Sequence, residues 1–230
     1  DKDGERAAML EKCGVRVFNK SAVIELCDDK NKTFLYLSGK NIPMPETITS
    51  PLLYPAFDDT DGLFADSVEK RLGYPMVVKE AYGSFGAQVY LAKNRSELDA
   101  LRNRLKYMPH LYQRYVKNSS GEDIRIIVVG GKAVAAMKRK NNGDFRANIE
   151  LGGVGEKYIP SSEQVELSER ICRLLGADYI GVDLLFDKDK TLLCEVNTNA
   201  HFMFISDCTG VDVAKLYVGH VMEEIYGRAD

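Results

Sequence analysis

The segment 181–199, GVDLLFDKDKTLLCEVNTN, places two carboxylates and an amide within a short apolar stretch. Apolar runs flank the turn at 187–190, which predicts a β-hairpin. Glu195 and Asn197 are two residues apart, so they share one face of a strand, and Asp183 lies nearly opposite Glu195 unless the register slips. Like charges opposite each other destabilise a sheet, but carboxylate and amide oxygens suit Mg²⁺. The segment is therefore either a magnesium site or a solvated edge hairpin.

A loop of small residues follows a buried strand in the segment 77–91, VVKEAYGSFGAQVYL. Lys79 closes the strand, and the backbone N–H groups around Gly83, Ser84 and Gly86 could bind phosphates, with the lysine as a point charge. The alternative is an ordinary glycine turn with a surface lysine. The sequence contains no GxxxxGK[ST] motif, and a strand rather than a helix follows the loop. A P-loop and a dinucleotide fingerprint are therefore excluded.

Cationic residues gather in the segment 137–153, MKRKNNGDFRANIELGG. They form either a solvated basic loop or a clamp for phosphoryl or carboxylate groups, to which the planar fork of arginine is suited. The residues concerned are Lys138, Arg139, Lys140, Arg146 and Asn148. His201 follows the carboxylate segment and is either a packing or surface residue or a substrate contact.

Composition limits the classes of protein that remain. The chain has 230 residues, 45% of them hydrophobic, and a net charge of −3, so no general basic field attracts nucleic acid. No apolar run approaches the roughly 20 residues that span a bilayer, and the charged N-terminus has no signal-peptide core. The five cysteines are odd in number and form no CxxC motif. A reduced, cytoplasmic protein with structural thiols is expected.

The secondary structure predicted from periodicity is an antiparallel α+β arrangement, because tight turns rather than helical crossovers join most strands. Helices are expected at about 5–13, 20–38, 66–72, 96–105, 161–176 and 210–226, with Ser96 as an N-cap and Gly176 at a helix end. Strands are expected at 15–19, 74–81, 89–93 and 110–116, and hairpins at 122–140 and 181–197. Residues 51–65 are expected to be loop, and a domain boundary is expected near 115–120.

The order of these segments resembles the ATP-grasp superfamily, and in particular the RimK-type α-L-glutamate ligases. The resemblance runs from about 28 to 226, and its most specific segments are GDFRANIELGG and GVDLLF…CEVN. It implies an α+β ATP-grasp fold, in which two α+β subdomains with mostly antiparallel sheets grip ATP between them. It also implies a division into a remnant of a preceding region with its connecting helix (1–40), a small lid subdomain (41–117) and a large subdomain with the metal site (118–230).

The resemblance assigns the nucleotide-binding residues to three segments. Lys30 and Lys79 resemble the lysines that contact ATP phosphates. The flexible loop that closes over them is matched by Gly83, Ser84, Phe85 and Gly86. The linker that holds adenine is matched by Gln113, Arg114, Tyr115 and Val116, and the acid near the ribose by Asp123.

The resemblance also implies the reactive centre. Arg125 and Arg146 resemble the catalytic arginines that face the transferred phosphate and the acyl group, and Asn148 lies beside them. Asp183, Glu195 and Asn197 resemble the ligands of Mg²⁺, for which Mn²⁺ could substitute. The positive charge of magnesium–ATP would then explain why the hairpin tolerates paired carboxylates.

The sequence departs from the family at four points. Arg114 stands where an acidic residue is usual, and Gln88 stands where a third glycine is common, which would stiffen the loop. After EVN the chain continues TNAHFMF rather than with Ser-Pro-Gly, so the acceptor substrate is expected to differ. The family also carries an α/β domain before this region, so the chain is expected to be a fragment.

The activity implied is that of an ATP-dependent ligase that joins a carboxylate to an amine through an acyl phosphate, forming a C–N bond. Glutamate or a similar amino acid would be added to a small-molecule or peptide acceptor. No nucleic-acid or membrane partner is expected, and pairing with a second copy is compatible with the family. Two alternatives stay open, a nucleotide-binding module without ligase activity and a structural protein that binds calcium or magnesium.

Overall fold

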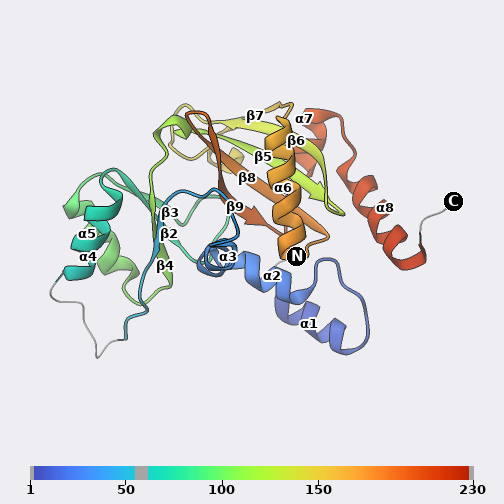
Figure 1. The fold of residues 1–230 in the computed structure, drawn as a ribbon, viewed down its shortest axis with the longest axis horizontal. Coiled ribbons are helices and arrows are strands. Elements are labelled where there is room, and N and C mark those ends of the chain that lie inside the picture. Colours follow the sequence, from blue (N-terminus) through green and yellow to red (C-terminus); the bar gives the residue numbers. More distant parts are fainter. Residues whose placement is uncertain (1–2, 55–61, 228–230) are drawn as a thin grey trace.

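Residues 3–54 and 62–227 are described by a computed structural model, in which two antiparallel sheets lie side by side with helices around them (Figure 1). The small sheet has the strand order β1-β4-β2-β3 and the large sheet the order β7-β6-β5-β8-β9. The strands of the small sheet are β1 (Thr47–Thr49), β2 (Met76–Glu80), β3 (Val89–Ala92) and β4 (His110–Arg114). Those of the large sheet are β5 (Glu122–Val129), β6 (Lys132–Lys140), β7 (Val154–Lys157), β8 (Tyr179–Asp187) and β9 (Lys190–Asn197).

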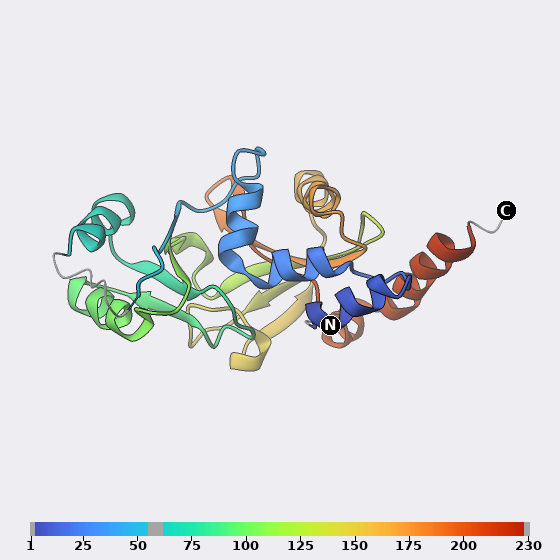
Figure 2. The same cartoon turned by 90° about the horizontal axis from the view of Figure 1, so that it is seen from below.

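Helices lie around both sheets, and α8 extends beyond the large sheet toward the C-terminus (Figures 1 and 2). Helices α4 (Leu63–Leu72) and α5 (Arg95–Leu105) pack on the small sheet, and α6 (Ser162–Leu175) crosses the large sheet. The remaining helices are α1 (Gly4–Lys12), α2 (Ser21–Asp28), α3 (Lys30–Leu37), α7 (Met203–Thr209) and α8 (Val213–Tyr226), with short 3₁₀ turns at Lys117–Ser119 and Ile149–Leu151. None of the helices in the described ranges is long and apolar enough to cross a membrane.

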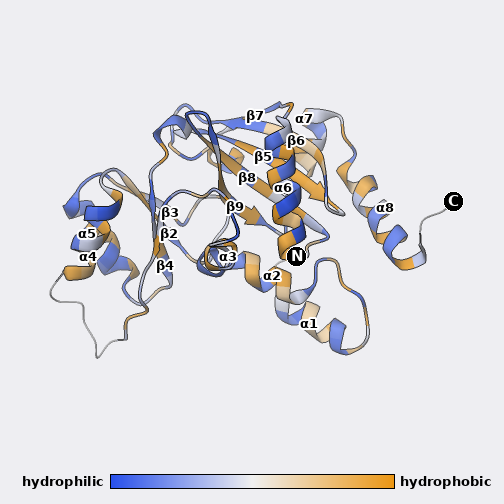
Figure 3. Cartoon of the chain, viewed as in Figure 1, coloured by the Kyte–Doolittle hydropathy of each residue, from blue (hydrophilic) through white to orange (hydrophobic). Residues whose placement is uncertain are grey.

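Alternate side chains of a strand point to opposite sides of its sheet. In the large sheet, apolar side chains on both sides are buried in core clusters. Ile124, Ile126 and Val128 pack with α6 and the N-terminal helices in one core cluster. Ile127 and Val129 pack on the other face, with α7 and the start of α8. In Figure 3 hydrophobic residues line the central strands and one side of α6, while the outer side of α6 is hydrophilic.

Several predicted elements are confirmed, and local capping explains where the boundaries fall. The expected helix at 20–38 is two helices, since Asp29 adopts extended backbone and its carboxylate accepts from the N–H groups of Asn31 and Lys32. Ser161 and Gln164 form a capping box at the start of α6, and Gly176 ends it in the left-handed conformation, as predicted. The hairpin expected at 122–140 is the β5–β6 pair, which turns at the glycine pair 130–131.

Three predictions on local structure are wrong. Residues 15–19 form no strand. The Asn19 side chain instead bonds the backbone at the start of β8, where its Nδ2 donates to Tyr179 O at 2.7 Å and its Oδ1 accepts from the N–H of Asp178 at 2.7 Å. The N-cap of α5 is Asn94 rather than Ser96. Helix α4 begins at Leu63, inside the expected loop, and residues 55–61 of that loop lie outside the described ranges. Helix α7 and strand β7 were not predicted from the sequence. The division into subdomains 1–40, 41–117 and 118–230 stays a prediction.

His110 is a buried ionisable group in the core of the small lobe. Its side chain is 3% exposed, with Nδ1 2.7 Å from Met108 O and Nε2 2.7 Å from the Tyr112 hydroxyl. Because the carbonyl can only accept, Nδ1 donates to Met108 and the neutral Nε2 accepts from Tyr112. Burial lowers the pKa of His110 below its ordinary value.

Acidification is therefore expected to destabilise the chain through His110. The unfolded chain binds this proton more tightly than the folded one, so the stabilising contribution is complete above the ordinary histidine pKa and is lost as the pH falls below it. One such group changes the free energy of unfolding by at most about 1.4 kcal/mol per pH unit. Urea titrations measure the free energy of unfolding at each pH. Between about pH 7.5 and 5 this free energy should depend less steeply on pH in His110→Asn than in the wild type. His201→Asn, at an exposed position, should retain the wild-type pH dependence, and an equal pH dependence in all three proteins would contradict this assignment.

Candidate active site

A cavity of about 250 Å³ lies between the small and the large sheet. The same alternation that fills the cores also supplies its walls. On the small sheet Val78 points into the core, so Val77 and Lys79 face the cavity. Every residue that the family resemblance assigned to the site lines this cavity, and the role of each stays a prediction; they are Lys30, Lys79, Gly83, Ser84, Phe85, Gly86, Gln113, Arg114, Tyr115, Val116, Asp123, Arg125, Arg146, Asn148, Asp183, Glu195 and Asn197. His201 lines it as well. Two cations of the candidate anion clamp, Lys138 and Lys140, pair with Glu122 instead and are not among the lining residues.

The register of the large sheet places its polar residues on the face that meets the cavity. Asp183 on β8 pairs with Glu195 on β9 and with Arg125 on β5, as the hairpin pattern predicted for the first pair. On β6, Arg139 pairs with Asp123. On β5, Asp123 and Arg125 therefore point to the same side of the sheet as Ile127 and Val129. Ile127 and Val129 are buried against α7, whereas Asp123 and Arg125 line the cavity.

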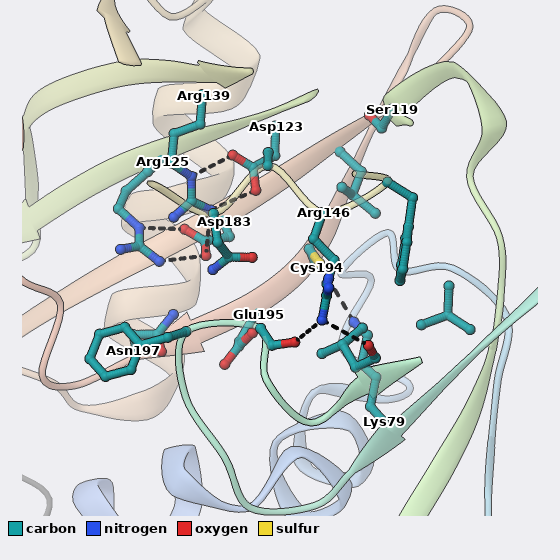
Figure 4. A pocket seen from close by; sticks show the side chains of 18 of the residues that line it. Lys79, Ser119, Asp123, Arg125, Arg139, Arg146, Asp183, Cys194, Glu195 and Asn197 are labelled. Atoms are coloured by element: carbon teal, nitrogen blue, oxygen red, sulfur yellow. Dashed lines mark hydrogen bonds and ion pairs between the residues drawn. The ribbon is translucent and has the colours of Figure 1, made fainter. Parts of the chain in front are cut away.

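Four of these side chains form one connected, largely buried ionic network (Figure 4). Arg139 binds both oxygens of Asp123 at 2.6 Å and also lies 2.9 Å from Asp183 Oδ2. Arg125 binds both oxygens of Asp183 at 2.7 Å. Such bidentate guanidinium–carboxylate pairs are the strongest ion pairs that side chains make. The positive charge beside Asp183, expected from magnesium–ATP, is thus already supplied in part by two arginines of the chain.

The two carboxylates of the network differ in protonation behaviour. Burial raises the pKa of Asp123 despite its contact with Arg139. Burial acts on Asp183 in the same direction, but there the two arginines outweigh it, and the pKa of Asp183 falls to about 2. Asp183 is therefore an ionised acceptor across the physiological range.

Both predicted lysines reach strand β9. Lys30 extends from the first turn of α3, and its Nζ lies 3.6 Å from Glu195 Oε1 and 3.2 Å from Gly83 O. Lys79 extends from β2, is 6% exposed, and its Nζ lies 3.6 Å from the Cys194 thiol (Figure 4). One cation therefore contacts Glu195, and the other contacts the residue before it on β9.

Arg146 connects the large lobe to the glycine loop. Its guanidinium forms a bidentate pair with Asp144 at 2.9 and 2.7 Å and donates to Gly86 O at 2.6 Å. The loop is also close to Asn148, since a Cβ on Gly86 would lie 2.8 Å from Asn148 Oδ1. The loop is thus in contact with the basic segment whose role in anion binding the sequence suggested.

The linker between the lobes is joined to the β8–β9 turn. Arg114, the departure from the family pattern, pairs with Asp187 at 2.8 Å. Ser119 donates to Phe186 O at 3.2 Å, one residue away from that pair. The Arg114 side chain is thus held by Asp187 of the β8–β9 turn. That the backbone of residues 113–116 binds adenine stays a prediction.

Three cavity residues make contacts that the sequence did not predict. Arg139 is expected to belong to a solvated basic loop or an anion clamp, but it is 2% exposed and binds two aspartates. Its position opposite Asp123 on a hairpin was the available signal. Cys194 precedes Glu195 and gave no signal of its contact with Lys79. Gln88, expected to stiffen the loop, has its carboxamide oxygen 3.2 Å from Ser84 N.

The donor set fits a divalent cation of the magnesium type. A carboxylate has about four acceptor positions, and the contacts of Asp183 with Arg125 and Arg139 use one position on Oδ1 and two on Oδ2. One position on Oδ1 remains, Glu195 is partly exposed to the cavity, and Asn197 lies two residues further along β9. Hard oxygen donors of this kind suit Mg²⁺, which keeps waters and shares phosphate oxygens.

Comparison with known proteins agrees with this geometry. The family model of the RimK-like ATP-grasp domain matches residues 27–221. Beta-citrylglutamate synthase B of Danio rerio is 35% identical over 222 residues, covering 95% of this chain and 53% of that protein. N-acetylaspartylglutamate synthase A of Homo sapiens is 34% identical over 222 residues, covering 95% of this chain and 55% of that protein. The chain therefore spans about half the length of these curated relatives.

A solved structure shows the same architecture. D-alanine–D-alanine ligase from Bacillus anthracis superposes with a TM-score of 0.75 at 21% identity, covering 96% of this chain and 75% of that one. The likeness confirms the predicted α+β ATP-grasp fold. The match to the family model over residues 27–221 establishes that the chain belongs to the RimK-like ATP-grasp family.

Proposed function

We propose that the chain is the ATP-binding part of a ligase that joins a carboxylate to an amine, with glutamate or a similar amino acid as the amine. The observation that carries this proposal is the arrangement of charge across the cavity. Lys30 contacts Glu195 and Lys79 contacts the neighbouring Cys194, while Asp183 on β8 and Arg125 on β5 continue the polar face of the sheet beside them. This arrangement offers cations for phosphate oxygens beside oxygen donors for a divalent ion.

The chemistry proposed begins with attack of an acceptor carboxylate oxygen on the terminal phosphorus of ATP. The bond from that phosphorus to the bridging oxygen of ADP breaks, which gives an acyl phosphate. An amine nitrogen then attacks the acyl carbon, the amine loses a proton, and inorganic phosphate leaves with the former carbon–oxygen bond electrons. The product is an amide, together with ADP and phosphate.

The protein's part in this chemistry is positioning and charge neutralisation, because phosphoryl transfer needs little covalent help. Lys30 and Lys79 would hold phosphate oxygens, and Arg125, fixed by Asp183, would orient the acyl group. Arg146 would position the glycine loop through its bond to Gly86 O. Asp183, Glu195 and Asn197 would hold Mg²⁺, which when bound neutralises charge on the phosphate oxygens.

The family resemblance assigns the segment after EVN to the acceptor side, and two of its residues, Asn199 and His201, line the cavity. They offer an amide and an imidazole group, which suit a small polar acid. The names of the two relatives combine glutamate with citrate or with N-acetylaspartate. These two acids, and a peptide that ends in glutamate, form the first panel of acceptors for this chain.

The test is release of ADP from magnesium–ATP by the full chain, with L-glutamate and each acid of the panel. The proposal predicts ADP release that requires both the acid and the amine, with the amide product identified by mass spectrometry. If ADP release requires only the acid, and hydroxylamine traps the acyl group, formation of the acyl phosphate is supported. The amine substrate would then be a compound other than L-glutamate. The same assay should be repeated on a longer protein, in which the chain is extended by the flanking regions that its relatives carry. If this longer protein binds ATP but releases no ADP with L-glutamate and any acid of the panel, a nucleotide-binding module without ligase activity is favoured.

A further inference from the structure

The side chain of Gln88 lies inside the glycine loop that joins β2 to β3. Its Oε1 accepts a hydrogen bond from the backbone N–H of Ser84 at 3.2 Å. A Cβ on Gly83 would lie 2.8 Å from Gln88 Cδ and 2.9 Å from Gln88 Cβ, so the carboxamide packs directly on the glycine backbone. Gly83 has a φ of +148°, a conformation that residues with a side chain rarely adopt. The absence of a side chain at 83 thus makes room for Gln88.

The rest of the loop is held by its carbonyl groups, from two directions. Lys30 donates from its backbone N–H to Ala81 O at 2.9 Å and from Nζ to Gly83 O at 3.2 Å. On the other side Arg146 donates to Gly86 O at 2.6 Å. The contacts from α3 and from the basic segment thus engage acceptors of the loop, whereas Gln88 engages one of its N–H donors. Donors of this kind are what a phosphate group binds in a glycine loop.

We propose that Gln88 is an internal competitor of phosphate, which rests on the proposed function. Its amide oxygen occupies the Ser84 N–H in the free chain and is displaced when a phosphate of magnesium–ATP binds there. The exchange favours the nucleotide, because a hydrogen bond to an ionised phosphate is roughly twice as strong as one to a neutral amide. Gln88 therefore lowers nucleotide affinity and limits binding to ligands that carry a phosphate able to replace it.

A purely structural role makes the opposite prediction for the same residue. If Gln88 only braces the loop over Gly83, its removal loosens the loop and weakens nucleotide binding. If it competes with phosphate, its removal strengthens binding by about the value of one net hydrogen bond, which corresponds to roughly 2- to 10-fold in Kd. The sign of the change in affinity therefore separates the two roles.

Calorimetric titration of the full chain with magnesium–ATP is the main experiment. Gln88→Ala is expected to lower Kd by about 2- to 10-fold. Gln88→Glu, which keeps the shape and adds a negative charge at the acceptor, is expected to raise Kd by at least about 10-fold. Lys93→Ala, at an exposed position just after β3, is the control and should leave Kd unchanged.

Amide hydrogen exchange of the free chain provides a readout that does not depend on nucleotide. Exchange at the Ser84 N–H should accelerate in Gln88→Ala and stay unchanged in Lys93→Ala. Faster exchange together with tighter binding supports the proposal. Wild-type binding of magnesium–ATP with an equal or higher Kd for Gln88→Ala overturns it and leaves the proposed function intact. If neither the wild type nor Gln88→Ala binds magnesium–ATP, the proposed function fails and the competitor role fails with it.

Discussion

Arg139→Met is expected to lower the free energy of unfolding by about 3–5 kcal/mol, because it leaves two carboxylates in a buried site without their shared cation. Arg139 is 2% exposed and binds Asp123 at 2.6 Å and Asp183 at 2.9 Å. Methionine fills a similar volume, so the loss reports on charge more than on packing. Urea denaturation at pH 7 measures the difference through the transition midpoint at constant slope.

Two further variants isolate the buried charge as the cause. Arg173→Met removes a cation that is 58% exposed and lies 3.7 Å from Glu169, so its effect should be below about 1 kcal/mol. Asp183 keeps its pair with Arg125, so Asp123 is the carboxylate that loses its guanidinium partner. Adding Asp123→Asn to Arg139→Met removes that charge and should recover part of the lost stability. A loss below about 1 kcal/mol for Arg139→Met itself would show that the network is solvated and would contradict its assignment as the buried scaffold of the site.

Glu195→Gln is expected to reduce ADP release by about 100-fold or more, which corresponds to about 2.7 kcal/mol or more of transition-state stabilisation. The substitution keeps size and one acceptor oxygen but removes the charge that the proposed Mg²⁺ ligand requires. It should also weaken the dependence of ATP binding on magnesium, which calorimetry measures separately from turnover.

Glu156→Gln on β7 is the matched control, since it removes the same charge from an exposed position. Its turnover and magnesium dependence should equal those of the wild type. Unchanged turnover in Glu195→Gln under conditions where the wild type is saturated would exclude this carboxylate from the metal site. The remaining donors, Asp183 and Asn197, would then have to be tested in turn.

The parts of the fold that the sequence predicted are those in which local chemistry and burial agree. The hairpin at 181–197 has apolar runs on both sides of a polar turn, and its predicted Asp183–Glu195 pairing is observed. Helix α6 carries a capping box and a C-terminal glycine, which are local signals. The predicted strand at 15–19 is absent because a distant partner decides its structure, since Asn19 bonds Asp178 and Tyr179.

The site residues were predictable in identity, but their partners were not. Lys79 and Asp183 could be selected because a charged residue on an otherwise apolar strand needs an explanation. The hairpin pattern could place Arg139 opposite Asp123, but that Arg139 also reaches Asp183 depends on the pairing of β5 with β8, which are distant in sequence. The contact between Gln88 and Ser84 depends on the positive φ angles of the loop. Neither of these two contacts has a signature in spacing or composition.

The measurement that tests the central claim most directly is thermal unfolding of the chain with ATP, with magnesium, and with both, in the wild type and in Lys79→Ala. A ligand that binds only the folded state at a hundredfold excess over Kd stabilises it by about 2.7 kcal/mol. The account predicts a rise in Tm that requires both ATP and magnesium and that is largely lost in Lys79→Ala. A Tm that rises with magnesium alone and does not respond to ATP, or that does not change with both, would contradict a magnesium–ATP site between the two sheets.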